Sequence, residues 1–304
     1  MEDALRIGLV GLDTSHSVAF TRILNDPEPP PETRVEGARV THAWGAREKG
    51  DLGTVVEERR EELAGQWSVE IVRKPADMLG KVDAVMLLSV NGADHLKLAR
   101  PFLAEGLPLF IDKPFTNTVG QARGLIKMIH ASGSVVMSCS ALRYADEVSA
   151  VVNEASEIGT PFGGCLSGPG HHREGMPGPL YYGIHTAEML QALFGTGVDS
   201  VRCEHSERED VATVYYSDGR TPVLRFVRGC DEGFWFSVSS VGGVRSAKVD
   251  AGTFYARMLE RVIEMFRTRR SPVSLPETFE VIALLEAIDR SGSKRGARIK
   301  LATL

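Results

Sequence analysis

The feature that most constrains the fold is a regular alternation of short apolar runs with longer amphipathic stretches along the first half of the chain. Runs rich in Val, Ile and Leu predict strands at residues 5–10, 40–44, 69–72, 82–89, 109–111 and 134–138. The stretches between them predict helices at residues 15–25, 52–64, 95–105 and 119–131. Since strands joined through helices run parallel, the pattern predicts an α/β fold with a doubly wound parallel sheet and helices on both faces.

The pattern changes after residue 141, where strands begin to follow one another with short links. Helices are predicted at residues 146–158, 180–194, 254–267 and 277–291, and strands at 162–166, 198–204, 211–216, 223–227, 235–241 and 246–249. Short links between consecutive strands predict an open, mainly antiparallel sheet in an α+β domain. A length of 304 residues suits two domains, and we expect them at residues 1–141 and 142–304.

Composition excludes several classes of protein. Lys and Arg number 35 against 40 Asp and Glu, for a net charge of -5, so no strong positive field favours a nucleic acid partner. No apolar run reaches the length of a membrane span or follows the layout of a signal peptide, which favours a cytoplasmic protein without a membrane partner. The cysteines are widely spaced without a CxxC pair. They are typical of single thiols rather than of a zinc site or a disulfide framework.

In an open parallel sheet the ligand binds outside the carboxyl ends of the strands, so the loop after the first strand is the first candidate site. Gly11 fills the first place of a Gly-x-Gly-x-x-Gly dinucleotide fingerprint, but Asp13 and His16 occupy the other two. The helix N-terminus still offers main-chain N–H groups to an anion. We expect a bound cofactor to meet Gly11 and the N–H groups of Thr14 and Ser15. Asp13 would turn away as a helix cap, or would serve only as that cap.

Two further loops bear on the cofactor. The second strand ends without the acidic residue that binds a ribose 2′-hydroxyl, and Arg47 just after it would suit a 2′-phosphate, which favours NADP over NAD. The alternative is a solvated surface arginine. Asn91 follows the strand at residues 82–89 and is a candidate cofactor contact, although Asn91 and His95 would equally serve as caps of the next helix.

Three segments farther along the chain carry a family resemblance. Asp112-Lys113-Pro114 stands at the end of the strand at residues 109–111, and Arg143-Tyr144 follows the strand at residues 134–138. His185 lies in the helical segment Tyr182-Gly183-Ile184-His185-Thr186. With these segments in this order, the chain resembles the Gfo/Idh/MocA oxidoreductases, the family named for glucose-fructose oxidoreductase and inositol dehydrogenase, over essentially its whole length.

The resemblance implies an N-terminal Rossmann domain and a C-terminal α+β domain whose open antiparallel sheet commonly mediates dimerisation. It also implies an enzyme that passes a hydride between NAD or NADP and a carbinol carbon of a sugar-, cyclitol- or polyol-like small molecule. A homo-oligomer, a dimer or higher, is therefore expected. Trp235, Phe236 and Val238 are neighbouring apolar residues that would cover the outer face of the second sheet.

Residue by residue, the resemblance implies a catalytic set. Lys113 matches the Lys of the family's Glu-Lys-Pro motif, with Asp112 in place of the Glu, and both are candidate cofactor contacts. His185 matches the His on the helix over the nicotinamide, and the family's common Asp four residues earlier is here Tyr181. A base for the hydroxyl proton should titrate near neutrality, as His does and as a desolvated Lys can. We expect Lys113 to hydrogen-bond the substrate hydroxyl, His185 to take or relay the proton, and Tyr181 to donate a hydrogen bond, all in one cleft.

A Gly- and Pro-rich loop at residues 168–178 precedes the helix of His185, and its composition is typical of a mobile segment that covers a substrate. On that helix Tyr181, His185 and Glu188 share one polar face. The candidate substrate contacts are Arg143, His171, His172 and Glu188. The histidines and Glu188 suit zinc or iron by ligand type. No motif fixes their spacing, however, and we predict no metal site.

Two classes of function are compatible with these residues. The leading hypothesis is an NAD(P)-dependent oxidoreductase, with NAD-assisted elimination or glycoside cleavage through transient oxidation as a neighbouring possibility. The contrasting hypothesis is a cofactor-free or non-catalytic descendant that binds a small ligand in the same cleft, which Asp13, His16 and Tyr181 favour. Binding of NADH or NADPH distinguishes the two.

Overall fold

The computed structural model describes residues 4–46, 50–229 and 233–304. The chain folds into two units. The first comprises Met1–Thr116, Arg123–Cys139 and Tyr255–Leu275, and the second comprises Asn117–Ala122, Ser140–Phe254 and Pro276–Leu304. The units therefore interleave along the sequence, and a segment from beyond residue 250 belongs to the first of them.

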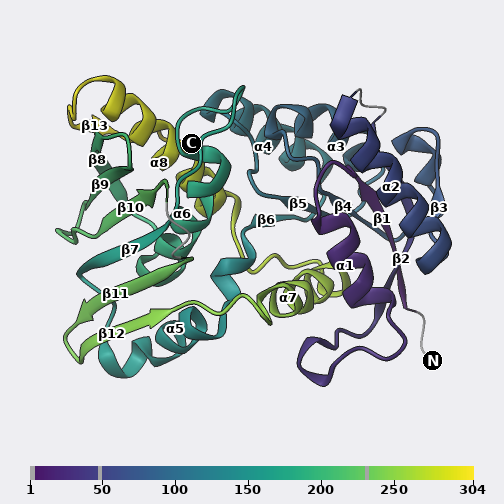
Figure 1. Ribbon diagram of the computed structural model, residues 1–304, viewed down its shortest axis with the longest axis horizontal. Coiled ribbons are helices and arrows are strands. Elements are labelled where there is room, and N and C mark those ends of the chain that lie inside the picture. Colours follow the sequence, from purple (N-terminus) through teal and green to yellow (C-terminus); the bar gives the residue numbers. More distant parts are fainter. Residues whose placement is uncertain (1–3, 47–49, 230–232) are drawn as a thin grey trace. The chain divides into compact units, whose positions relative to one another are not determined.

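Within the residues described, the first unit is built on a six-stranded parallel sheet, as the alternating pattern predicts (Figure 1). Its strands are β1 (Leu5–Val10), β2 (Ala38–Trp44), β3 (Glu70–Ile71), β4 (Ala84–Leu87), β5 (Leu109–Asp112) and β6 (Val136–Cys139). The spatial order is β3-β2-β1-β4-β5-β6, so the order reverses between β1 and β4. This is the doubly wound Rossmann arrangement, in which ligands bind outside the carboxyl ends of the strands at the reversal point.

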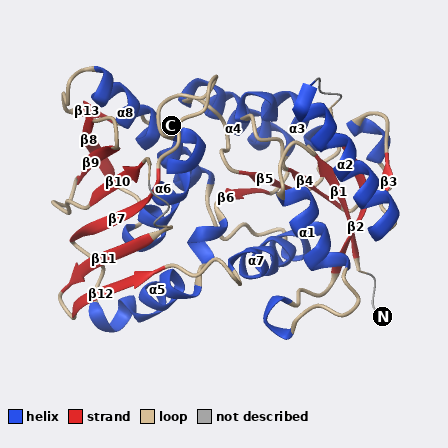
Figure 2. Ribbon diagram, in the orientation of Figure 1, coloured by secondary structure: helices blue, strands red, loops and turns tan. Residues whose placement is uncertain are grey.

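Helices flank this sheet and alternate with its strands in sequence (Figure 2). They are α1 (His16–Asn25), α2 (Gly50–Trp67), α3 (His95–Ala104), α4 (Val119–Ser132) and α7 (Phe254–Thr268). Every residue of β4 and β5 is buried, as expected for parallel strands that are covered on both faces. The helix α7 comes from far along the chain and packs beside α1, where the Tyr255 ring lies 5.4 Å from the Phe20 ring. The periodicity of residues 254–267 predicts this helix, but it does not predict that the helix packs beside α1.

The described part of the second unit contains a seven-stranded sheet with the order β12-β11-β7-β10-β9-β8-β13. Its strands are β7 (Gly163–Pro169), β8 (Val198–His205), β9 (Glu209–Tyr216), β10 (Val223–Val227), β11 (Trp235–Ser240), β12 (Gly243–Lys248) and β13 (Ile299–Lys300). All neighbouring pairs are antiparallel except β7 with β10. The mainly antiparallel sheet is thus confirmed, while the short edge strand β13 has no sequence prediction.

Three helices accompany the second sheet, namely α5 (Asp146–Ile158), α6 (Leu180–Phe194) and α8 (Leu275–Ser293). All three were expected from their periodicity, with α5 and α6 matching residues 146–158 and 180–194. None of the helices in the described ranges combines the length and the apolarity needed to cross a bilayer.

Burial alternates along the strands of the second sheet. In β11, Phe236 and Val238 are buried, whereas Trp235 lies on the opposite face and is half-buried. The prediction that all three residues cover the outer face is therefore wrong for Phe236 and Val238, because successive side chains of a strand point to opposite faces. Only Trp235 is left for the open face.

Candidate functional site

The loop between β1 and α1 packs directly on the loop after β4. Gly11 has a φ of +107°, and a Cβ added to it would lie 2.4 Å from the main-chain nitrogen of Ser89. The Gly11 N–H also donates to the carbonyl of Trp44 at the end of β2, at 2.8 Å. Only glycine tolerates both this positive φ and this close approach to Ser89. Gly11 therefore fixes the place where the ends of β1, β2 and β4 meet.

Asp13 is turned toward the loop after β4. Its carboxylate accepts a hydrogen bond from the Val90 N–H at 2.9 Å. The N-cap of α1 is Ser15, whose side chain makes no capping hydrogen bond. The prediction that Asp13 caps α1 is therefore wrong. The helix begins only at His16, and Asp13 lies too early in the loop to reach its first N–H groups.

The N-terminus of α1 keeps open main-chain donors. The Thr14 hydroxyl accepts the His16 N–H at 3.3 Å, and the Thr14 carbonyl accepts the Ser17 N–H at 3.4 Å. Among the described residues, the N–H groups of Thr14 and Ser15 have no partner. These are the two groups expected to meet a diphosphate, and a helix N-terminus favours an anion there.

His16, which stands at the third fingerprint position, forms a buried polar contact across the sheet edge. Its Nδ1 lies 2.6 Å from an oxygen of Asp112 at the end of β5, and its Nε2 lies 2.9 Å from the Tyr255 hydroxyl. The side chains of His16 and Asp112 are 12% and 5% exposed. Sequence reasoning treated His16 only as a missing glycine and did not single out Tyr255, because these residues are far apart in the chain.

The Asp112 carboxylate is held as an anion beside Lys113. Burial alone would raise the pKa of Asp112, but the charge of His16, its hydrogen bond, and the charge and main-chain N–H of Lys113 hold that pKa below its ordinary value. Lys113 follows β5 directly and is half-buried. The structure therefore confirms that Lys113 lies at the carboxyl end of the fifth strand.

A hollow of about 530 Å³ lies at the carboxyl ends of β2 and β3. Its lining residues are Trp44, Gly45, Arg60, Ile71, Val72 and Arg73. Arg60 donates to the carbonyl of Gly45, yet its buried Nε has no partner among the described residues. Arg73 is exposed. The lining residues thus include an aromatic ring and two guanidinium groups but no carboxylate, although Arg60 also donates to Glu57 at 2.8 Å. Arg47, the sequence candidate for this place, lies outside the described residues.

Asn91 and His95 tie the loop after β4 together. The Asn91 side chain accepts the Ala93 N–H at 3.1 Å and caps the short helix Gly92–Asp94 ahead of α3, which confirms its interpretation as a cap. The His95 ring is fully buried between the carbonyls of Ser89, at 2.8 Å, and Phe115, at 3.0 Å. Burial lowers the pKa of His95. His95 therefore links the loops after β4 and β5 rather than capping a helix with its side chain.

In the second unit, His185 projects from α6 with a fixed ring. The Ser140 hydroxyl lies 2.6 Å from Nδ1, and the rings of Tyr182 and Phe234 flank the imidazole at 5.7 and 5.5 Å. Ser140 is buried and also accepts the Leu142 N–H at 3.1 Å. Sequence reasoning missed Ser140, which lies 45 residues before His185 and has no motif of its own.

Two candidate substrate residues are instead paired with each other. Arg143 donates to the Glu188 carboxylate at 3.0 Å, with side chains 10% and 4% exposed, and its second nitrogen lies 3.7 Å from Glu277. Burial raises the pKa of Glu188, while the charge and hydrogen bond of Arg143 lower it. On the predicted polar face of α6, Glu188 is therefore occupied by an internal ion pair with Arg143.

The neighbouring histidines of the loop before α6 diverge. His171 packs its ring against Tyr182 at 5.5 Å, whereas His172 reaches β9 and lies 3.2 Å from Asp210. Tyr181 lies against the Tyr182 ring at 5.1 Å, with the Arg173 guanidinium 5.0 Å above its own ring. In the described part of the chain, no group of three or more His, Cys, Asp or Glu side chains is arranged to hold a metal ion.

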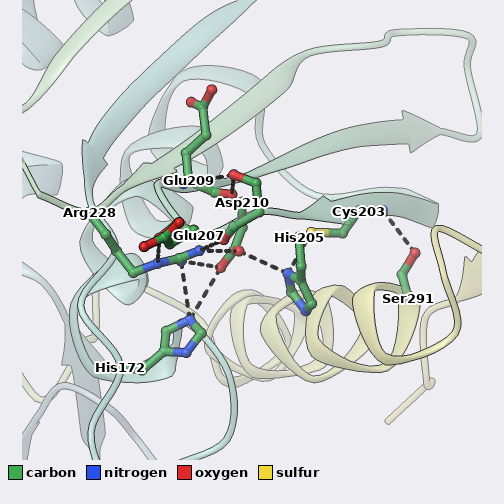
Figure 3. Close-up of polar contacts among 9 residues, drawn as sticks. His172, Cys203, His205, Glu207, Glu209, Asp210, Arg228 and Ser291 are labelled. Atoms are coloured by element: carbon green, nitrogen blue, oxygen red, sulfur yellow. Dashed lines mark hydrogen bonds and ion pairs between the residues drawn. The ribbon is translucent and has the colours of Figure 1, made fainter.

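Figure 3 shows why His172 is held at the sheet. Asp210 is fully buried, and both its oxygens accept hydrogen bonds from Arg228 at 2.8 Å. His205 approaches the same carboxylate at 2.9 Å. Burial would raise the pKa of Asp210, but Arg228 and the two imidazoles hold it below its ordinary value. The loop is thus anchored at His172 through a buried carboxylate that carried no sequence signal.

The sequence candidates therefore gather in two places. In the first unit, Gly11, Asp13, Thr14, Ser15, Asn91, Asp112 and Lys113 occupy the loops after β1, β4 and β5. In the second unit, Tyr181, His185 and Glu188 lie along α6, with Arg143, His171 and His172 around it. Lys113 and His185 belong to different units, and their convergence in one cleft stays a prediction.

Comparison with known families agrees with this geometry. Residues 41–139 match the model of the Gfo/Idh/MocA family, described as an oxidoreductase family with an NAD-binding Rossmann fold. The match confirms, over these residues, the resemblance indicated by the sequence motifs. A search of curated proteins found none that matches the chain in sequence.

Solved structures share the fold along nearly the whole chain. The myo-inositol 2-dehydrogenase from Lactobacillus plantarum has a TM-score of 0.81 at 15% identity, covering 99% of this chain and 100% of its own. The scyllo-inositol dehydrogenase from Lactobacillus casei has a TM-score of 0.82 at 14% identity over 99% of both chains. The myo-inositol dehydrogenase from Lactobacillus casei, in complex with NAD(H) and myo-inositol, has a TM-score of 0.78 at 14% identity, covering 99% of this chain and 98% of its own. At these identities the likeness establishes the fold alone.

The buried ion pair on α6 gives a stability prediction. Arg143→Met leaves the Glu188 carboxylate buried without its cation, and we expect the free energy of unfolding to fall by about 3–5 kcal/mol at neutral pH. The double variant Arg143→Met with Glu188→Gln should recover part of that loss, because no buried charge remains. Urea unfolding of the three proteins measures both effects.

The stability of the wild-type protein should depend on pH in a defined direction, and that of Arg143→Met more steeply, because Arg143 lowers the pKa of Glu188. Since the folded-state pKa of Glu188 lies above its ordinary value of 4.5, the folded protein retains a proton that the unfolded chain releases. Stability from this group is therefore full at pH below 4.5 and is lost as the pH rises through the folded-state pKa. Equal losses in the single and the double variant, at every pH, would contradict the pairing.

Proposed function

We propose that the protein is an NAD(P)-dependent oxidoreductase that transfers a hydride to or from a carbinol carbon of a sugar-, cyclitol- or polyol-like substrate. The observation that carries the proposal is the edge of the Rossmann sheet, where open N–H groups of α1 stand near the buried Asp112 and the half-buried Lys113. The match of residues 41–139 to an NAD-binding oxidoreductase family supports it. The inositol dehydrogenases that share the fold support the substrate class.

The residues present fit a dinucleotide. Gly11 permits a close approach of main chain at the strand ends, and the N–H groups of Thr14 and Ser15 are open to a diphosphate. The negative charge of Asp13 is partly satisfied by the Val90 N–H. The hollow beside Trp44 would take the adenosine end. When bound, the nicotinamide of such a cofactor accepts or gives the hydride.

We further propose that the cofactor is NADP rather than NAD. The hollow at the ends of β2 and β3 has two arginines and no acidic side chain among its lining residues. Arg73 is exposed there, whereas Arg60 is paired with Glu57 at 2.8 Å and keeps only its buried Nε without a described partner. A ribose 2′-phosphate favours guanidinium groups at this end of a Rossmann sheet, whereas a 2′-hydroxyl favours a carboxylate.

The NADP preference is testable by binding. We expect NADPH to bind more tightly than NADH, and Arg73→Gln to weaken NADPH binding roughly tenfold or more, since a hydrogen bond to a charged group is worth about 1.5–3 kcal/mol. The affinity for NADH should not change. Calorimetric titration with both dinucleotides gives the dissociation constants, and quenching of Trp44, which lines the hollow, reports the same event.

Arg39→Gln is the matched control, because Arg39 is an exposed arginine near the amino end of β2. Equal affinity of the wild-type protein for NADH and NADPH would contradict the NADP preference. Failure to bind either dinucleotide would contradict the oxidoreductase and favour the cofactor-free ligand-binding alternative.

In the oxidation of a carbinol, each candidate side chain has a separate role. The Lys113 ammonium hydrogen-bonds the substrate hydroxyl and withdraws electron density from its O–H bond. The His185 ring, oriented by the Ser140 hydroxyl, takes the proton as the hydride leaves, or passes it on. Tyr181 donates a hydrogen bond to the substrate, in the place where the family commonly has an Asp. The role of Glu188 and Arg143 is to hold α6 in position rather than to touch substrate.

Lys113→Met tests the catalytic role of the ammonium group. The substitution keeps much of the stem while removing the charge, and general acid-base groups contribute about a hundred- to ten-thousand-fold in rate. We expect a loss of that order in kcat on a cyclitol or sugar oxidised by the wild-type protein, followed through the absorbance of the reduced cofactor. Lys127→Met on α4, an exposed lysine, is the control. A loss of less than about threefold would remove Lys113 from the reaction.

We also propose a homodimer through the open face of the second sheet. Strand register places Arg225 opposite Val211, and the half-buried Trp235 of β11 pairs with Ser167 of β7, which lies between β11 and β10. Half-buried apolar side chains among polar ones are typical of a surface that a second copy covers. Sedimentation velocity at micromolar concentration should give a dimer, and Trp235→Lys should shift it toward the monomer. A wild-type monomer at that concentration would contradict the proposal.

A further inference from the structure

Two departures from the family's sequence pattern meet in the first unit. His16 occupies the third glycine position of the fingerprint, and Asp112 occupies the position of the Glu in the Glu-Lys-Pro motif. They lie 96 residues apart in the chain, yet Nδ1 of His16 is 2.6 Å from the Asp112 carboxylate. Both side chains are almost fully withdrawn from solvent. Because of this direct contact, His16 and Asp112 are treated as one pair.

The contacts fix the tautomer of His16. An ionised Asp112 can only accept hydrogen bonds, so Nδ1 of His16 must carry the hydrogen. Nε2 lies 2.9 Å from the Tyr255 hydroxyl and, when the ring is neutral, accepts a hydrogen bond from it. Phe20 stacks on the imidazole at 5.2 Å and contacts Tyr255 at 5.4 Å. The ring is therefore held by two directed hydrogen bonds and by an aromatic side chain.

The pair is connected to Lys113 through the main chain. The Lys113 N–H and the Lys113 charge both act on the Asp112 carboxylate. Asp is one methylene shorter than Glu, so its carboxylate stays close to the end of β5. The imidazole of His16 spans the remaining distance from α1. Loss of either partner would free the Asp112 rotamer and, with it, the turn that carries Lys113.

We propose that His16 is a positioning residue: with Asp112 it replaces the glycine and glutamate of the family pattern and holds Lys113 at the mouth of the cofactor site, while Tyr255 locks the ring. The proposal rests on the proposed oxidoreductase function. The proposal predicts that His16 and Asp112 are energetically coupled. It also predicts that a double variant carrying the family residues, His16→Ala or His16→Gly together with Asp112→Glu, keeps the function.

A double-mutant cycle tests the coupling. We expect His16→Ala and Asp112→Glu each to weaken NADPH binding roughly tenfold, and the double variant to return to within about threefold of wild type. His42→Ala is the matched control, because His42 lies 3.3 Å from the Glu70 carboxylate on the edge of the same sheet. Additive effects of the two substitutions, or variants that lose melting temperature while NADPH affinity stays unchanged, would overturn the proposal.

A second measurement does not depend on the cofactor. Imidazole nitrogen NMR of the histidine-labelled protein, assigned with His16→Ala, should show His16 as the Nδ1–H tautomer. Tyr255→Phe keeps the ring packing and removes only the hydroxyl, and it should move the His16 signals toward the Nε2–H form that prevails in water. An Nε2–H tautomer in the wild-type protein would overturn the pairing. Absence of binding to NADH and NADPH with the Nδ1–H tautomer intact would overturn the proposed function and the positioning role, but not the pair itself.

Discussion

The site in the first unit depends on one close contact between main chains. Gly11 brings the end of β1 against Ser89 at a distance that any Cβ would prevent, and the same residue is bonded to the end of β2. With these strand ends fixed, α1 begins at His16 and its first N–H groups point outward from the sheet edge. The loops after β4 and β5 then lie close enough for side chains to form hydrogen bonds with them. Asp13, His95 and Asp112 each take part in such a contact.

Buried carboxylates give each unit its internal order. Asp112 is paired with His16 in the first unit, and Glu188 with Arg143 and Asp210 with Arg228 in the second. A buried charge without its partner is costly, so each pair strongly favours one arrangement of the elements it joins. Two of the pairs connect elements that are distant in sequence, α1 with β5 and the turn after β6 with α6. The third joins the consecutive strands β9 and β10. These pairs align the segments from which the candidate catalytic side chains project.

Periodicity was sufficient for most of the secondary structure because it reports burial directly, although it did not predict the short edge strand β13. The apolar runs at β4 and β5 predict central parallel strands, and the alternation in β9 and β11 predicts a sheet with one open face. The register of side chains was harder: Phe236 and Val238 were expected beside Trp235 although a strand turns them the other way. Contacts over long separations were out of reach. The meeting of His16 with Tyr255, and of His172 with Asp210, depends on packing that no local pattern contains.

The fingerprint glycines describe one solution to a geometric problem, and the loop after β1 has another. A second glycine gives a diphosphate room, and a third lets the helix approach the sheet. Here Asp13 directs its carboxylate to the Val90 N–H, which withdraws the charge from the helix N-terminus. The His16 ring is directed toward Asp112, so that this side chain, larger than a glycine's, is also kept away from the helix N-terminus. The N–H groups of Thr14 and Ser15 remain open. The feature that decides whether such a loop can bind an anion is therefore the set of unpartnered donors, and a count of glycines is only an indirect measure of it.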